Sequence, residues 1–296
     1  ETAVAAERSR VATEGWGAKL LALQGEDGQW AGGAHFPSSF SWSDVERGED
    51  GRMVEQPWTA TSWSLSLLRV LGLDPTSPEA QRAVAMVREG SRWEHAGQRF
   101  FDGEVEPCIN GLTVAIGSYF GEDVSGIVDR LLGEQMDDGG WNCEQENGST
   151  RGSFHTTISV LEGLLEHQDR VGPFSELVDA RSRGEEYLLE RRLFRSLSSG
   201  DVIDPAWTQF SFPTWWHYDV LRGLDHLAKA GVKPDERVEE ALRLVEDNRL
   251  PDGRWPRQNI HRGDTHFAID GAEGEPSRWN TLRALRVLKW AGRDGG

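Results

Sequence analysis

The feature that most constrains the fold of this chain is a short turn that recurs along it. Residues 24–30 read QGEDGQW, residues 135–141 read QMDDGGW and residues 252–255 read DGRW. Glycine supplies a tight turn, aspartate can cap exposed backbone amides, and tryptophan can close the end of a helical layer. Two further stretches keep part of the pattern: RFFDGEVEP (99–107) lacks the tryptophan, and DVIDPAW (201–207) lacks the glycine.

Two kinds of predicted helix flank these turns, because apolar residues recur at helical spacing and no sustained strand pattern occurs. Apolar stretches that begin beside Pro or Phe are predicted to be inner helices: 56–72, 106–121, 153–167, 212–227 and 275–290. Amphipathic, charged stretches that precede them are predicted to be outer helices: 4–24, 79–90, 124–135, 176–195 and 235–248. The Pro or Phe markers at 57, 107, 154, 213 and 276 are 50, 47, 59 and 63 residues apart. Such spacing is typical of repeated helix pairs.

The turns at 24–30 and 135–141, with their alternating outer and inner helices, resemble the repeat of squalene and oxidosqualene cyclases. They are also similar to the beta subunit of protein prenyltransferases. The resemblance implies an all-α fold, an α/α toroid of five hairpins whose inner helices line a central cavity. It covers nearly the whole chain, which we expect to be a single domain over 1–296. Its repeats are expected at roughly 1–72, 73–121, 122–168, 169–230 and 231–296.

The resemblance predicts the fold better than the function, because lanthipeptide cyclases, complement thioester domains and sugar-active enzymes also form toroids. Cyclases that protonate an alkene use an Asp-x-Asp-Asp motif, and this sequence contains none. Direct triterpene cyclisation is therefore not expected.

Composition excludes several classes of partner. The chain of 296 residues has 32 Lys and Arg against 49 Asp and Glu, a net charge of −17 that opposes binding to nucleic acid or anionic membranes. No apolar run approaches the roughly 18 residues of a membrane span. The first residues do not read as a signal peptide, and only two cysteines occur, so we expect a cytoplasmic protein. The sequence leaves a disulfide between them open.

Candidate metal ligands come from the prenyltransferase resemblance, which implies zinc held by an Asp-x-Cys at one inner helix and a His at the next. Here Glu106-Pro107-Cys108 and His155 occupy those places, with Glu instead of Asp. Cys143 offers a second set, Cys108, Cys143 and His155, similar in composition to the zinc site of lanthipeptide cyclases. Thiolate, imidazole and carboxylate all bind zinc. The alternative is structural, since cysteine is commonly a small buried hydrophobe and a His opening a helix can cap it.

An apolar ligand is indicated by the 13 tryptophans, against 3 tyrosines. Aromatic faces suit isoprenoid chains and stabilise cations, although tryptophan is also a common packing residue. The tryptophans expected to bind substrate open the inner helices: Trp58, Trp63, Trp215, Trp216 and Trp279.

Charged candidates lie beside them. Segment 254–278 concentrates Arg257, Arg262 and Arg278 with two histidines, and could hold a carboxylate or diphosphate or simply pair with acidic neighbours. Asp219 and His217 are candidates for general acid or base chemistry, unless Asp219 pairs with Arg222 in a helix salt bridge. The long Gly- and Ser-rich loop over 31–56 is predicted to be a lid or a partner surface.

The sequence thus predicts an enzyme acting on an apolar or isoprenoid-like small molecule in an aromatic cavity, with zinc as a candidate cofactor. The alternative is a non-catalytic toroid that binds a small ligand or a partner protein. A dry, tryptophan-filled centre would favour that alternative.

Overall fold

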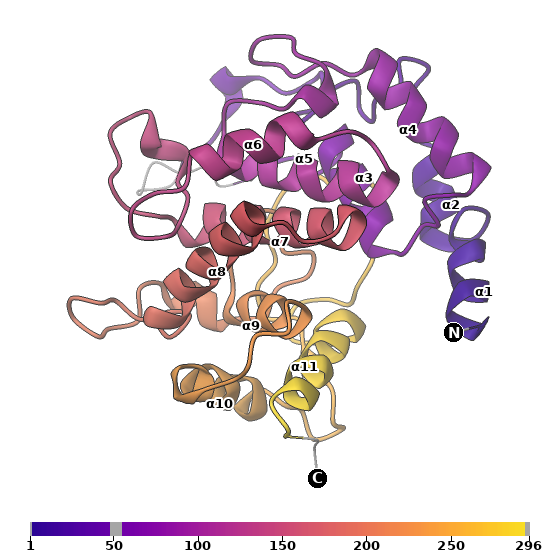
Figure 1. The fold of residues 1–296 in the computed structure, drawn as a ribbon. Helices are drawn as coiled ribbons and strands as arrows, with labels where there is room; N and C mark the ends of the chain where they lie inside the picture. The colour runs from indigo at the N-terminus through magenta and orange to yellow at the C-terminus, as the bar shows by residue number, and fades with distance from the viewer. Residues whose placement is uncertain (1, 48–54, 294–296) are drawn as a thin grey trace. The chain divides into compact units, whose positions relative to one another are not determined.

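Helices dominate this computed structural model, which describes residues 2–47 and 55–293 (Figure 1). The prediction of a mostly helical chain is confirmed. Beyond helices, the described residues contain a small antiparallel sheet in which β1 (Trp255–Pro256) pairs with β2 (Pro276–Ser277). No helix among them is both long and apolar enough to cross a membrane.

The chain divides into two compact units. The first comprises residues 1–133, 163–174 and 262–267, and the second comprises residues 134–162, 175–261 and 268–296. Helix α7 (Phe154–Val171) contributes its first half to the second unit and its second half to the first.

The first unit is built around α5, which packs against α3, α4 and α6 (Figure 1). Its helices are α1 (Thr2–Val11), α2 (Gly15–Leu21), α3 (Thr61–Val70), α4 (Pro78–Gly90), α5 (Pro107–Phe120) and α6 (Ser125–Gly133), with short 3-10 helices η1 (Trp42–Asp44) and η2 (Phe100–Asp102). The outer helix predicted over 4–24 is two helices, because the chain turns after Val11 and Gly15 takes a left-handed φ of 62°. Large buried side chains form the core, among them Trp30, Trp63, Trp93 and Phe100.

The second unit is built around α9, which packs against α10 and α11 (Figure 1). Its helices are α8 (Ser175–Glu190), α9 (Val220–Lys229), α10 (Glu239–Asp247) and α11 (Arg278–Trp290), with short 3-10 helices η3 (Cys143–Gln145), η4 (Pro205–Thr208) and η5 (Glu236–Val238). The inner helix predicted over 212–227 begins only at Val220. Asp219 ends the preceding turn by capping α9, since its carboxylate accepts the Arg222 amide hydrogen at 2.7 Å.

The recurrent turn has the same local design wherever its sequence is complete. The aspartate accepts the amide hydrogen two residues on, as Asp138 does from Gly140 at 3.1 Å. The tryptophan amide then donates to a threonine hydroxyl at the start of the following inner helix, as Trp30 does to Thr61 at 3.1 Å. Both bonds recur at the third complete turn, where Asp252 accepts the Arg254 amide hydrogen and the Trp255 amide donates to Thr281. The Trp141 amide likewise donates to the Thr157 hydroxyl. The turn therefore joins each inner helix to the outer helix before it.

The glutamine that opens the motif in the turns at 24–30 and 135–141 also makes hydrogen bonds. Gln24 donates to the carbonyl oxygens of Gly28 and Ala83, each at 2.9 Å. Gln135 does the same to Gly139 and Ala180, at 2.7 and 2.8 Å. Each glutamine thus bonds its own turn to the next outer helix, α4 or α8.

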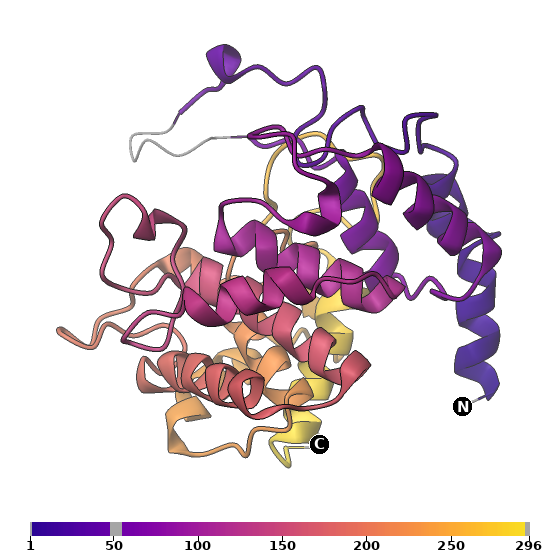
Figure 2. The same ribbon diagram turned by 45° about the horizontal axis from the view of Figure 1, so that its top comes forward.

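The loop predicted as a lid or partner surface lies partly outside the described residues, which omit 48–54. Within its described part, residues 33–37 pack against the first unit, and residues 38–47 extend away from the helices of that unit (Figure 2). Phe36, Phe40 and Trp42 pack against one another there, with ring centroids 4.4 to 5.1 Å apart.

Candidate functional site

Three rings of the second unit form a continuous stack, which we call the ring stack: Trp216, His217 and His261. The Trp216 and His217 centroids are 3.7 Å apart, and those of His217 and His261 are 3.6 Å apart with planes only 3° from parallel. His155, at the start of α7, meets Trp216 edge-on at 5.1 Å. The ring stack thus combines apolar faces with imidazole nitrogens.

The electrostatics of the ring stack keep its imidazoles neutral. Burial lowers the pKa of His217 far below its usual 6.5, and the neighbouring His261, His155 and Arg222 lower it further. Burial likewise lowers the pKa of His261 to about 4. At ordinary pH both rings are therefore proton acceptors in an apolar setting.

Arg222 of α9 fixes the backbone that carries the stack. Its Nη1 donates to the carbonyl oxygens of Trp215 at 3.2 Å and His217 at 2.8 Å. Its Nε and Nη2 donate to the two carboxylate oxygens of Glu162 at 3.0 and 2.7 Å, a bidentate pair. Trp215 has a left-handed φ of 49°, which residues other than glycine rarely adopt. Because this backbone conformation is strained, the bonds from Arg222 help to hold it.

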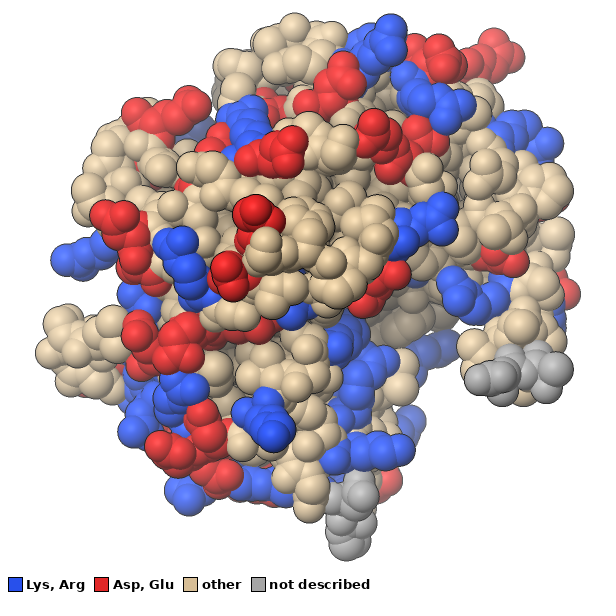
Figure 3. Space-filling model, viewed as in Figure 1, with Lys and Arg blue, Asp and Glu red and all other residues tan. Residues whose placement is uncertain are grey.

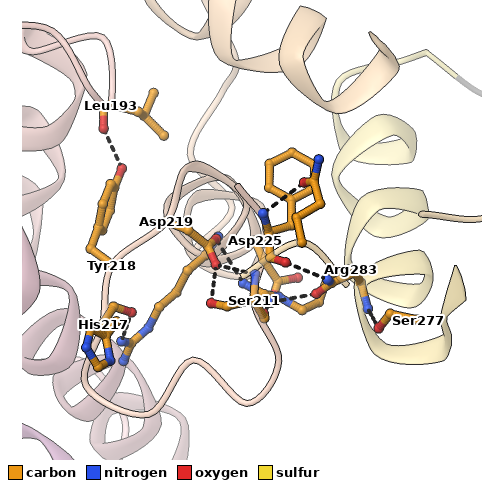
Figure 4. A network of polar contacts seen from close by, with 12 residues as sticks. Leu193, Ser211, His217, Tyr218, Asp219, Asp225, Ser277 and Arg283 are labelled. Carbon is orange, nitrogen blue, oxygen red and sulfur yellow. Dashed lines mark hydrogen bonds and ion pairs between the residues drawn. The ribbon is translucent and has the colours of Figure 1, made fainter. Parts of the chain in front are cut away.

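Asp219 is part of a buried polar network beside the ring stack (Figure 4). Ser211 donates to its Oδ2 through both its amide, at 3.1 Å, and its hydroxyl, at 2.9 Å. Arg283 of α11 lies 3.5 Å from its Oδ1, the oxygen that also caps α9. The expected alternative of an Asp219–Arg222 salt bridge is replaced by a backbone bond, because the Arg222 side chain is taken by Glu162. Asp219 therefore has a structural role as a helix cap.

His155 has its ring orientation set by a backbone bond. Its Nδ1 accepts the amide hydrogen of Tyr218 at 2.8 Å. A neutral imidazole that accepts at Nδ1 carries its proton on Nε2, so neither nitrogen offers a lone pair to a metal. His155 in this conformation does not fit the ligand role expected for it.

The other expected zinc ligands have suitable chemistry. Of the expected ligands, Glu106 and Cys108 belong to the first unit, and Cys143 belongs to the second. Cys108 Sγ lies 3.5 Å from the Glu106 carboxylate, Cys143 Sγ lies 3.4 Å from the Thr156 hydroxyl, and both cysteines are thiols. A carboxylate and two thiolates are ordinary zinc donors, so this set fits a zinc ion in donor type.

The tryptophans expected to bind substrate differ in exposure. Trp58 and Trp63 of the first unit are 2% and 1% exposed, and their indoles donate to the carbonyl oxygens of Arg262 and His35. Trp279 stacks on Phe212 at 4.6 Å and donates to the Ile269 carbonyl oxygen. Trp58 and Trp63 are thus buried packing residues, whereas Trp279 is half-buried. Trp215 and Trp216 are half-buried and stay candidates for ligand contact.

The three arginines expected to bind an anion differ in burial and belong to different units. Arg257 is half-buried and donates to the Gly271 carbonyl oxygen at 2.9 Å, and burial lowers its pKa. Arg278 is exposed in the second unit, and Arg262 is exposed in the first. Figure 3 shows basic and acidic side chains interspersed over much of the face drawn.

Sequence reasoning missed Glu162, Arg283 and Trp207. In the sequence, Glu162 and Arg283 look like ordinary charged residues of helices. Only the fold brings Glu162 to Arg222 and Arg283 to Asp219. Trp207 had a signal, since it ends the degenerate turn DVIDPAW. It lies against His155, with ring centroids 5.6 Å apart.

The chain matches no known protein-family model and none of the curated proteins. The site geometry therefore carries the functional argument.

Proposed function

We propose that this chain is an enzyme similar to terpene cyclases and prenyltransferases, acting on an apolar or isoprenoid-like substrate at the ring stack of its second unit. The toroidal arrangement implied by the resemblance is part of the proposal, as is the cytoplasmic location expected from the two cysteines. The observation that carries the proposal is the parallel stacking of two half-buried, neutral imidazoles, His217 and His261, on a tryptophan face.

Such imidazoles suit one kind of proton transfer. A base whose pKa is far below 6.5 takes a proton only from a strong acid. A carbocation is one: its neighbouring C–H bond breaks, the electron pair forms a C=C bond and the proton moves to the imidazole. The faces of Trp215 and Trp216 can stabilise the cation beforehand. Because the chain lacks Asp-x-Asp-Asp, we confine the proposal to this deprotonation step, with His217 as the base.

The residues around His217 support it as the base. Arg222 and Glu162 hold the Trp215–His217 backbone, so the imidazole is presented in one orientation. Asp219, which is committed to capping α9 and to Ser211, is left out of the chemistry.

The test is product formation from isoprenoid diphosphates and squalene, followed by gas chromatography and mass spectrometry. His217→Gln should lower the rate about 100-fold or more, the usual contribution of a positioned base. Exposed His95→Gln is the matched control and should leave the rate unchanged. Turnover that survives in His217→Gln would remove His217 as the base.

The non-catalytic alternative is favoured by one observation: the indoles of Trp58, Trp63 and Trp279 are used for backbone bonds. A toroid filled by such packing would bind a small ligand or partner protein without turnover. Saturable binding of an isoprenoid, with no product from any substrate, would support this alternative.

Zinc assistance is a separate hypothesis. A zinc ion held by the thiolates that the resemblance implies would polarise a bound substrate or activate a thiol. Nothing in the proposed role of His217 depends on it.

A further inference from the structure

Trp207 differs from seven other tryptophans in the use of its indole N–H. In the described part of the chain, indoles donate to backbone carbonyl oxygens at Trp30, Trp58, Trp63, Trp93, Trp255, Trp279 and Trp290. Trp207 is only 7% exposed, and its Nε1 has no hydrogen-bond partner among the described residues. A buried donor without an acceptor is costly, so this one calls for a physical reason.

The incomplete turn at 201–207 explains why this donor lacks an acceptor. In complete turns the tryptophan indole donates to a carbonyl ten residues back, near the end of the outer helix: Trp30 to Leu20 at 2.7 Å and Trp255 to Val245 at 2.6 Å. Helix α8 ends at Glu190, 17 residues before Trp207, whereas α2 ends 9 residues before Trp30. The residue ten positions before Trp207 is Leu197, which is 62% exposed. The longer connection thus removes the usual acceptor.

The surroundings of Trp207 place this donor at the candidate site. Its ring lies 4.6 Å from Phe154, 5.2 Å from Tyr218 and 5.6 Å from His155, centroid to centroid. The Tyr218 hydroxyl is already bonded to the Leu193 carbonyl oxygen at 2.7 Å (Figure 4). Phe154 has no polar atom. The indole N–H is therefore a polar group within a cluster of aromatic rings, all of it in the second unit.

A second orphaned atom lies at the other end of the same line of rings. His261, beyond His217 in the ring stack, has a buried Nε2 without a hydrogen-bond partner in the described chain. The ring contacts run from Trp207 through His155 and Trp216 to His217 and His261. An apolar surface with a polar atom near each end suits a ligand that is mostly hydrocarbon but carries oxygen.

We propose that the Trp207 indole N–H is a ligand-binding donor that selects an oxygenated isoprenoid, such as an alcohol or ether, over the hydrocarbon of the same skeleton. The inference rests on the proposed function, because it concerns the ligand of that site. The ligand oxygen accepts the hydrogen bond that no protein carbonyl accepts. Since Nε1 has no solvent contact, the encounter displaces a neighbouring ring, and His155 is a half-buried ring in contact with Trp207.

The experiment compares farnesol with farnesene, binding each to the full chain labelled with ¹⁵N-tryptophan. Trp207→Phe keeps an aromatic ring at this position and removes the indole N–H. The cross-peak that this variant lacks in the indole spectrum is assigned to Trp207. We expect wild-type protein to bind farnesol about 3- to 10-fold more tightly than farnesene, the usual worth of one hydrogen bond. Farnesol should shift the Trp207 cross-peak, and Trp207→Phe should bind both ligands equally.

Trp255→Phe is the matched control, because its indole already donates to Val245. It should lower the melting temperature and keep the preference for farnesol. Trp207→Phe should lower the melting temperature less, because both variants lose the same ring volume but only Trp255→Phe also breaks a hydrogen bond. A loss of stability equal to that of Trp255→Phe would overturn the inference, since the Trp207 N–H would then have a protein partner.

The ligand outcomes separate this inference from the proposed function. Equal binding of both ligands by wild type and Trp207→Phe, with turnover intact, overturns the role of Trp207 and leaves the proposed function standing. Binding of neither ligand, with no turnover of any isoprenoid, overturns both. Preference for farnesol that Trp207→Phe abolishes, without turnover, supports Trp207 and overturns the enzyme.

Discussion

The imidazole rings of His217 and His261 lie parallel with their centroids 3.6 Å apart. The two residues are 44 positions apart in the sequence, one in the turn before α9 and the other in the loop between β1 and β2. Two protonated rings could not hold this arrangement, because buried like charges repel and lack solvent. The geometry therefore excludes a doubly protonated pair, and the lowered pKa of each ring keeps both neutral at ordinary pH.

Acid should weaken the fold through this pair. The pKa of His261 is about 4 in the folded chain and near 6.5 when unfolded, so between these pH values only the unfolded chain binds the proton. The free energy of unfolding therefore falls as pH drops from 6.5 towards 4, by about 2–3 kcal/mol for this residue. His261→Gln should flatten that part of the profile, measured by urea unfolding from pH 7.5 to 4.

The control for this experiment is His95→Gln, which removes an exposed histidine. Its pH profile should parallel that of the wild type. A His261→Gln profile that also parallels the wild type would mean that His261 is not shielded from protons in the folded chain.

Breaking the tether between Arg222 and Glu162 should cost far more than breaking a surface ion pair. Arg222→Gln leaves Glu162 and two carbonyl oxygens without their donor, and we expect a loss of about 3–5 kcal/mol. Arg222→Lys should not restore stability, because an ammonium cannot make the bidentate pair and reach both carbonyls. A double-mutant cycle with Glu162→Gln, followed by urea unfolding, measures the coupling.

The comparison pair is Arg10 and Glu14, which are 2.7 Å apart on the surface, with side chains 56% and 57% exposed. The same cycle there should show no measurable coupling. Equal coupling for the two pairs would show that the Arg222 tether does not organise the Trp215–His217 segment.

Zinc binding should depend on the thiols and not on His155. After zinc is offered and excess removed, elemental mass spectrometry should find about one ion per wild-type chain, and none in Cys108→Ser or Cys143→Ser. His155→Ala should keep the ion, because its Nδ1 is used by the Tyr218 amide. Zinc lost from His155→Ala would restore the prenyltransferase-like ligand set, and zinc absent from the wild type would exclude this metal.

The recurrent turn could be predicted from the sequence because its bonds are local. The roles expected for Gly, Asp and Trp match the bonds of Asp138, Trp30 and Trp255. The tertiary partners could not be predicted. Glu162 and Arg222 are 60 residues apart, and neither has a local pattern that marks a buried pair. The identity of Asp219 as a cap was hidden because the Pro at 213 suggested an earlier helix start.

The turn glycines provide a last prediction, because three of them share a conformation and differ in surroundings. Gly28, Gly139 and Gly253 have φ values of 82°, 84° and 83°. A Cβ atom would lie 2.3 Å from the Met86 carbonyl oxygen at Gly28 and 2.5 Å from the Arg183 carbonyl oxygen at Gly139. At Gly253 the nearest atom is the end of the Arg249 side chain, at 3.5 Å.

Alanine at Gly253 should therefore cost only the strain of a left-handed φ, about 1 kcal/mol. Alanine at Gly28 or Gly139 adds a collision with backbone of the next outer helix, which cannot move without opening the turn, so we expect about 3 kcal/mol. Urea unfolding of the three variants gives the comparison. Equal losses at all three positions would mean that the turn is strained but not packed against that helix. A larger loss at Gly28 and Gly139 would confirm that the repeated turn joins each hairpin to the next.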